Sequence, residues 1–310
     1  MASFSLERPF GVYLWDYFSQ TYELIVGKPA ETFSFVQGLT PLSTNNEVIV
    51  ACVTYLVVIF GGQALMREQS PFKFKVLFQI HNLLLTAVSF ILLVLLIEEL
   101  IPIVAKNGIF YAICSPQAWT QKLELLYYLN YLVKYWELFD TVFLVVKKKK
   151  LEFLHWFHHS MTALLCYTQL VGSTTVSWVP IVLNLTVHVL MYWYYFRTAG
   201  GAKIWWKKYL TTMQIIQFVI DLFVIYFCTY THFAYTYSSL PTLGDCSGSE
   251  NAAYFGCALL SSYLLLFINF YAKTYQKKAA DKKAADKKAA AAPTSENGSS
   301  KKKGGKSKKV

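Results

Sequence analysis

Long apolar stretches recur along the chain, and short polar connections separate them. A helix that crosses a membrane needs roughly 20 mainly apolar residues. Seven stretches approach that length, at about 48–66, 77–97, 123–146, 152–172, 175–196, 209–232 and 252–273. The pattern therefore predicts an all-α, polytopic membrane protein with seven transmembrane helices, of which the third is the least apolar.

Basic residues follow every second apolar stretch. They occupy the connections after the first, third, fifth and seventh stretches, whereas the other connections hold only Lys106 and Lys122. Because cytosolic loops are enriched in Lys and Arg, we expect a lumenal N-terminus and a cytosolic C-terminus. The predicted organisation is a lumenal segment at 1–47, a seven-helix transmembrane domain at 48–275 and a basic cytosolic tail at 276–310.

Composition supports lipid as the solvent. The 310-residue chain is 55% hydrophobic and 15% charged, against about 25% charged residues in a soluble domain. Residues 277–310 carry +9 of the net charge of +11, so the remaining chain is nearly neutral and does not resemble a nucleic-acid-binding domain. The low-complexity tail is expected to be disordered, and its last residues, KSKKV, resemble dilysine signals for retrieval to the endoplasmic reticulum. The N-terminus shows no pattern of a cleavable signal peptide.

Polar side chains interrupt the apolar stretches at similar depths. Counted at 1.5 Å per residue from the flanking basic residues, five of them lie about 9–13 Å inside the membrane: His81, Asp140, His158, His188 and Gln217. Lys134 is deeper, at about 19 Å. Further polar residues share helical faces with them: Asn130, Glu137, Thr141, Asn184, Tyr192, Tyr195, Gln214 and Asp221. Ionisable groups inside a span are functional candidates by default.

Each of these residues also has a structural interpretation. His81, Gln214 and Gln217 are of the type that joins helices by hydrogen bonds, and Lys134 with Glu137 is equally consistent with a neutralised structural ion pair. The sequon Asn184-Leu-Thr186 lies inside a span, so we interpret it as a chance match.

The histidines at 155, 158 and 159 are different, because packing gains nothing from three imidazoles. Their spacing of i, i+3 and i+4 places them on one helical face. A membrane di-iron centre of the desaturase or hydroxylase type would need several such boxes, and the chain has six histidines, with His232 far along the sequence. We therefore expect no metal, with a single zinc ion as the remaining metal alternative. A neutral imidazole is instead suited to nucleophilic attack on a thioester, with a second histidine moving the proton.

Four motifs resemble one known family. They are KxxExxDT at 134–141, HxxHH at 155–159, HxxMYxYY at 188–195 and TxxQxxQ at 211–217. In order and spacing they are similar to the motifs of the ELO-type very-long-chain fatty acid elongases, the membrane 3-ketoacyl-CoA synthases. Short residue runs elsewhere in the chain resemble the fungal branch of that family. Weaker similarity runs from about residue 8 to 275. Four residues depart from the usual fungal pattern, which puts the pocket shape in question: Trp156, Phe157, Ser160 and Met161.

The resemblance implies condensation of acyl-CoA with malonyl-CoA, without a cofactor, at a site enclosed by six helices around a narrow acyl tunnel. His158 would be the nucleophile, and His188 would assist proton transfer or hold the malonyl unit. His155 and His159 would orient the site. The charged residues Lys134, Glu137 and Asp140 would position it.

Substrate contacts are expected from nine further residues: His81, Asn130, Asn184, Tyr192, Tyr195, Gln214, Gln217, Lys203 and Lys207. Coenzyme A would enter from the cytosol and the acyl chain would point towards the lumen. The expected partners are membrane lipid, the other elongation-cycle enzymes (ketoacyl-CoA reductase, dehydratase and enoyl-CoA reductase) and a second copy in a homodimer, with no nucleic acid. A seven-span receptor or transporter is a further alternative, although neither role requires the histidine cluster.

Two cysteines, Cys114 and Cys246, lie in connections assigned to the lumen. Because the lumen is oxidising, we predict a disulfide between them that braces the closed end of the tunnel. The other four cysteines, Cys52, Cys166, Cys228 and Cys257, are expected to be buried thiols.

Overall fold

The computed structural model describes residues 4–276, which belong to two compact units, 1–270 and 271–310. The predicted tail and its KSKKV ending therefore lie outside the described residues, apart from a short π-helix at Ala272–Gln276. Nine α-helices account for most of the described chain: α1 Leu14–Val26, α2 Asn45–Leu65, α3 Lys75–Cys114, α4 Gln121–Glu137, α5 Phe139–Val146, α6 Phe153–Val171, α7 Trp178–Ala199, α8 Lys207–Tyr237 and α9 Glu250–Tyr271. The expected all-α class is confirmed for these residues.

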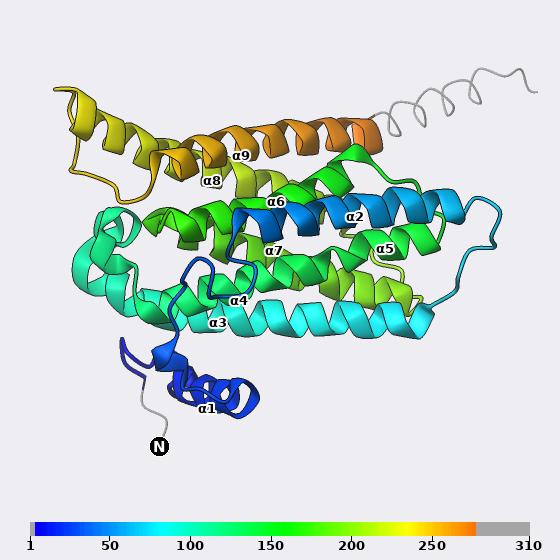
Figure 1. Cartoon of the computed structure of the whole chain (residues 1–310), viewed down its shortest axis with the longest axis horizontal. Coiled ribbons are helices and arrows are strands. Elements are labelled where there is room, and N and C mark those ends of the chain that lie inside the picture. The colour runs from blue at the N-terminus through cyan, green and yellow to red at the C-terminus, as the bar shows by residue number, and fades with distance from the viewer. Residues whose placement is uncertain (1–3, 277–310) are drawn as a thin grey trace, which may run out of the picture. The chain divides into compact units, whose positions relative to one another are not determined.

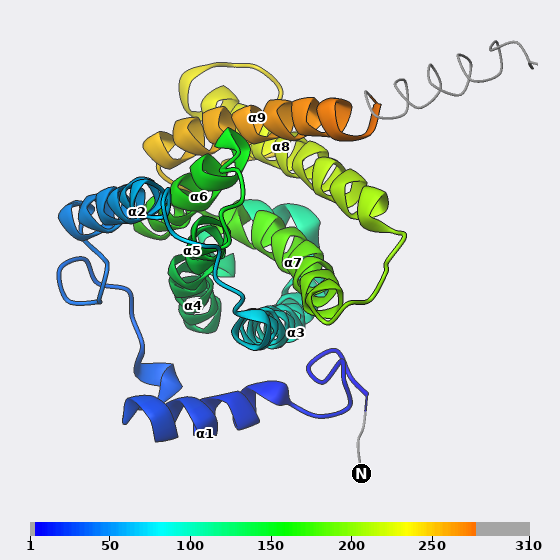
Figure 2. The same cartoon turned by 90° about the vertical axis from the view of Figure 1, so that its right-hand side faces the viewer.

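Helices α2 to α8 run roughly along one direction in the first unit (Figure 1). Viewed from the end, α3 lies beside α7, α4 beside α6 and α8 beside α7, and α2 packs against α5 (Figure 2). The amphipathic helix α1 lies to the side of this bundle, across α3 (Figure 2). The bundle thus brings α4, α6 and α7, which carry the conspicuous polar residues, into its middle.

Five segments are long and apolar enough to cross a membrane: Asn45–Leu65, Lys75–Cys114, Thr175–Ala199, Lys207–Tyr237 and Glu250–Gln276. The chain is therefore a multi-pass membrane protein. The stretches expected at 123–146 and 152–172 do form helices, but they do not meet the same criterion. The first is divided at Leu138 into α4 and α5 and contains Lys134, Glu137 and Asp140, and the second, α6, contains three histidines.

Helix ends differ from the expected spans where a helix continues beyond its apolar part. Helix α3 extends past residue 97 to Cys114, with a break at Gly108, whose φ of 84° is a conformation that favours glycine. Helix α8 likewise begins at Lys207 and ends at Tyr237. Hydropathy identifies the part of a helix that lipid can solvate, and it does not identify the helical turns that follow outside.

Local signals explain where several helices begin. Thr44 caps α2 through a reciprocal pair with Glu47, in which each side chain accepts from the other's backbone N–H. Thr120 caps α4 by accepting from the Leu123 amide. The start of α1 is capped from another helix, since the buried carboxylate of Glu98 on α3 accepts from the amides of Leu14 (2.7 Å) and Trp15 (2.8 Å). This contact fastens the N-terminal segment to the bundle.

Candidate active site

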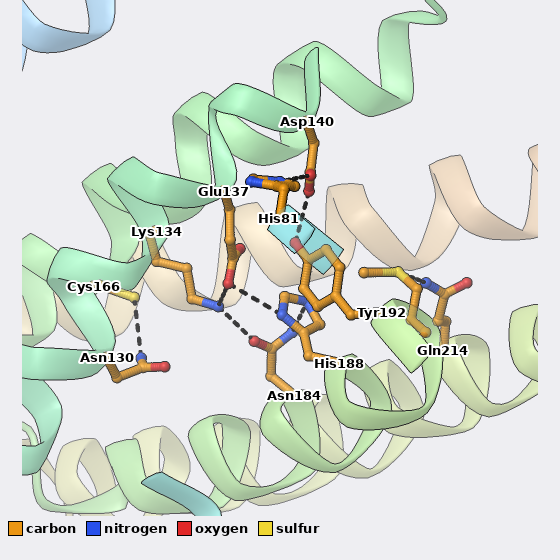
Figure 3. A network of polar contacts seen from close by, with 11 residues as sticks. His81, Asn130, Lys134, Glu137, Asp140, Cys166, Asn184, His188, Tyr192 and Gln214 are labelled. Atoms are coloured by element: carbon orange, nitrogen blue, oxygen red, sulfur yellow. Dashed lines mark hydrogen bonds and ion pairs between the residues drawn. The ribbon is translucent and has the colours of Figure 1, made fainter. Parts of the chain in front are cut away.

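A closed ring of polar contacts joins α4 to α7 in the interior (Figure 3). The Lys134 ammonium donates to Glu137 Oε1 and to Asn184 Oδ1, both at 2.8 Å. His188 Nδ1 lies 3.1 Å from Glu137 Oε1, and His188 Nε2 lies 3.2 Å from Asn184 Nδ2. Lys134 and Glu137 are only 2% and 1% exposed. A charge pair this deeply buried is stable only when further polar contacts complete it. Asn184 supplies a hydrogen bond to Lys134, and His188 lies within ion-pair distance of Glu137.

The contact with Asn184 fixes which tautomer a neutral His188 adopts. The Asn184 amide nitrogen can only donate, so His188 Nε2 must accept, and a neutral imidazole then carries its proton on Nδ1. His188 Nδ1 lies within ion-pair distance of Glu137 Oε1, although no hydrogen bond of good geometry joins the two atoms. The tautomer and the orientation of His188 are therefore both set by its neighbours.

A second carboxylate joins three helices next to this ring. Asp140 Oδ1 lies 2.7 Å from His81 Nε2, and Asp140 Oδ2 accepts from the Tyr192 hydroxyl at 2.7 Å (Figure 3). Helices α3, α5 and α7 are thereby connected at one depth. The sequence-based expectation that these polar groups converge from separate helices agrees with these contacts.

The three histidines of α6 divide into two environments. The rings of His155 and His159 are 4.6 Å apart, and neither borders the cavity described next. His158 is turned towards α8 and α9, where its ring lies 4.7 Å from that of Tyr263 and 6.4 Å from that of Phe218. Among the described residues, no hydrogen bond reaches a ring nitrogen of His158. Of the three imidazoles, only His158 combines a free nitrogen with access to open space.

A long, mostly apolar cavity begins at His158 and runs between α4, α6, α7, α8 and α9. Its polar end is formed by four side chains: Lys134, His158, Asn184 and Gln217. Its other end is formed by the loop at 246–249 and by His232 on α8. Gln217 and His232 are 15 residues apart on one helix, which corresponds to about 22 Å. The lining residues of the cavity therefore extend along more than half of the hydrocarbon core of a bilayer, which is about 30 Å thick.

Several predicted substrate contacts lie apart from the ring. Asn130 borders the cavity and donates to Cys166 Sγ at 3.9 Å, while Gln214 donates to Met191 Sδ at 3.6 Å. Gln217 borders the cavity and pairs with Asp221 on its own helix. Three other predicted contacts are exposed: Tyr195, Lys203 and Lys207. The polar residues expected in one common layer thus form two neighbouring networks, around Glu137 and around Asp140. Separate polar pairs lie around these networks.

Tyr263 on α9 is a neighbour of His158 that the sequence analysis did not select. Its hydroxyl donates to the His158 carbonyl oxygen at 3.2 Å and lies 3.0 Å from Thr162 Oγ1. The signal available was a tyrosine after two serines inside an apolar span, which is weak beside a histidine motif. The contact places α9, with no charged residue between 251 and 272, against the part of α6 that carries the three histidines.

The residues do not gather as a metal-binding set around the histidines. In the part of the chain that the structure describes, the one group of three His, Cys, Asp or Glu ligand atoms within 4.8 Å consists of Cys114, Cys228 and Cys246. Cys114 and Cys246 form a disulfide. Cys228 and Cys257 are buried thiols, whereas Cys52 and Cys166 are half-buried.

Comparison with known proteins points to one family. The pattern of the ELO family, described as GNS1/SUR4, matches residues 40–283. The chain is 52% identical to "Putative fatty acid elongase 1" of Schizosaccharomyces pombe over 277 residues, which cover 89% of this chain and 83% of that protein. It is 34% identical to "Fatty acid elongase A" of Dictyostelium discoideum over 255 residues, covering 81% and 90% respectively. The region that matches the family contains all four motifs.

Proposed function

We propose that this chain, which belongs to the ELO (GNS1/SUR4) family, is a fatty acid elongase that condenses a long-chain acyl-CoA with malonyl-CoA. The products are 3-ketoacyl-CoA, CO2 and free CoA, as in the first step of an elongation cycle. The observation that carries the proposal is the position of His158, whose ring borders the polar end of a long apolar cavity.

His158 is the proposed nucleophile. A ring nitrogen attacks the thioester carbonyl, the carbon–sulfur bond breaks, and CoA leaves as a thiol with the proton that the imidazole loses. Malonyl-CoA then loses CO2, and its α-carbon attacks the acyl-imidazole carbonyl. The carbon–nitrogen bond breaks, its electron pair leaves on the imidazole, and that nitrogen takes up one proton from water, so His158 is neutral again. Among the described residues, no hydrogen bond occupies its ring nitrogens. This supports the role, because a nucleophile must have a free electron pair.

Lys134 and Asn184 face the same end of the cavity as His158. Positioned donors stabilise the oxyanion that forms when a carbonyl is attacked, so we assign that role to this pair. His188 does not border the cavity, but it contacts Asn184 and Glu137. Its proposed role is therefore indirect, through these neighbours. This is one contact further from the substrate than the sequence analysis expected.

The length of the cavity supports a preference for long acyl chains, which would extend from His158 towards the disulfide. CoA would then remain at the end of the cavity near the basic residues Lys203 and Lys207. We further propose seven spans, with α4 and α5 together forming the third and α6 the fourth. The proposed location is the endoplasmic reticulum membrane, with a lumenal N-terminus, next to the reductases and dehydratase of the cycle.

The test is direct. Purified full-length protein is incubated with carboxyl-labelled malonyl-CoA and a series of acyl-CoAs, and released labelled CO2 and 3-ketoacyl-CoA are measured. We expect both products in equal amounts and only when an acyl-CoA is present. CO2 release without a ketoacyl product, or no release with any chain length, would contradict the proposal. Elemental analysis of the same preparation distinguishes a di-iron oxidase, which would contain iron.

A further inference from the structure

Three cysteine sulfurs gather at the end of the cavity that lies away from His158. Cys114 at the end of α3 and Cys246 in the loop between α8 and α9 form a disulfide. The thiol of Cys228 on α8 is free, and its Sγ lies within 4.8 Å of both disulfide sulfurs. All three residues are buried. A free thiol held beside a disulfide is an arrangement that thiol–disulfide exchange requires.

We propose that Cys228 is an exchange partner of this disulfide. Its thiolate attacks Sγ of Cys246, a bond forms between Cys228 and Cys246, and the bond between Cys114 and Cys246 breaks. The electron pair of the broken bond leaves on Cys114 Sγ, which takes up the proton that Cys228 lost. One disulfide and one thiol are present before and after, so no oxidant or reductant is consumed.

The surrounding structure indicates which sulfur moves. Cys114 and Cys228 are fixed on helices, whereas Cys246 belongs to a loop, 238–249, without regular secondary structure. The residues on either side of Cys246 are held to both helices. Ser247 N donates to the Cys114 carbonyl oxygen at 2.8 Å, and Asp245 Oδ1 lies 2.8 Å from His232 Nδ1, one turn after Cys228 on α8.

These two contacts keep Cys246 between its two partners in either pairing. The loop therefore needs no large displacement to exchange one covalent connection for the other. The consequence is local: the loop becomes covalently bonded to α8 in place of α3, and the end of α3 keeps its hydrogen bond to the loop. Because Cys228 and Cys246 both border the cavity, the exchange alters the wall at that end. The inference concerns the sulfurs alone and does not depend on the proposed function.

The first experiment uses the unmodified full-length protein, purified without reductant. It is incubated with N-ethylmaleimide in mildly alkaline buffer, where more thiol is ionised, and its peptides are mapped by mass spectrometry without reduction. We expect alkylated Cys114 to appear with time, together with a Cys228–Cys246 disulfide, and we expect neither in Cys228→Ser. Absence of alkylated Cys114, or its equal appearance in Cys228→Ser, would overturn the proposal.

The second experiment removes the original partner. Cys114→Ser is treated with glutathione disulfide, which is reduced as the new bond forms, and Cys246 is expected to pair with Cys228. The matched control is Cys114→Ser with Cys257→Ser, because Cys257 is another buried thiol on the cavity wall; it should retain the new bond. Pairing of Cys246 with Cys257, or a Cys246 that stays free in a folded variant, contradicts the proposal. If Cys114→Ser does not fold, the first experiment decides alone.

Discussion

Helices α2 and α4 show how differently two helices of the same bundle use their side chains. Helix α2 is apolar on all sides, and only 17% of the residues in its most apolar stretch are buried inside the protein. In helix α4 three polar side chains, those of Asn130, Lys134 and Glu137, are buried. In a soluble protein the apolar helix would be buried, and the charged side chains would be exposed to water. Here lipid solvates the apolar helix, whereas the polar helix finds partners only inside the protein.

The comparison also explains why α4, α5 and α6, which contain Lys134, Asp140 and the histidine cluster, are less recognisable as membrane spans than α2. Each buried polar group lowers the apparent hydropathy of its helix, and each one also needs a polar partner inside the protein. Lys134 and Asp140 meet this need through α7, by contacts with Asn184 and Tyr192. A polar site inside a membrane protein therefore both weakens the span signal and holds the helices together.

The largest effect is expected at His158. Replacing His158 with Ala removes the proposed nucleophile while the ring of polar contacts between α4 and α7 remains, so condensation should fall by at least ~10³-fold with little change in unfolding. The measurement is turnover with labelled malonyl-CoA, together with mass spectrometry of the protein for a bound acyl group. His155→Ala is the control on the same helix, because it should still form the acyl-enzyme. A His158→Ala enzyme of normal activity would assign the chemistry elsewhere.

The next effect is expected at the buried ion pair. Lys134→Met leaves the Glu137 carboxylate without its cation, and the free energy of unfolding should fall by about 3–5 kcal/mol. Equilibrium unfolding in mixed detergent micelles provides the measurement. Replacing both charges, as in Lys134→Met with Glu137→Leu, should restore part of the loss, since no isolated charge then remains. A double variant less stable than Lys134→Met alone would show that the pair is not the source of the effect.

A smaller effect is expected from a single hydroxyl group. Tyr192→Phe removes a hydrogen bond to the Asp140 carboxylate and should cost about 1.5–3 kcal/mol, the range for bonds to charged groups. Tyr55→Phe is the matched control. Its hydroxyl lies 2.7 Å from Thr141 Oγ1, a neutral partner on α5, so its loss should cost only about 0.5–1.5 kcal/mol. The same unfolding measurement compares them, and equal costs would contradict the importance of the charge.

The smallest effect is expected on the lipid side of α2. Val57 is 65% exposed, whereas Ile59, two residues further, is fully buried. Val57→Ala should change the free energy of unfolding by less than ~0.5 kcal/mol, and Ile59→Ala should cost at least ~1 kcal/mol because it leaves a cavity. If the two substitutions had the same effect, α2 would pack against something on its outer side.

Much of this architecture could be predicted from the order of residues. The apolar stretch predicted at 48–66 corresponds to α2, and the one at 252–273 corresponds to α9, with ends that differ by a few residues. The depth count placed His81 and Asp140 at one level, and the contact between them agrees with it. Helix α1 was not predicted, because its thirteen residues form an amphipathic pattern too short to distinguish from a loop segment. The break at Leu138 was also missed, since no glycine or proline marks it.

By itself, the sequence determined the class of protein, the helices and the set of polar residues that must avoid lipid, because hydropathy and helical spacing are local properties of the chain. The tertiary structure decided which of those residues meet. Three histidines on one helical face are equivalent in spacing, yet only His158 borders the cavity, because α8 and α9 leave open space on its side while His155 and His159 face each other. The position of Cys228 beside a disulfide formed by two other segments was equally beyond the sequence, since no spacing along the chain encodes the distances between two helices and a loop.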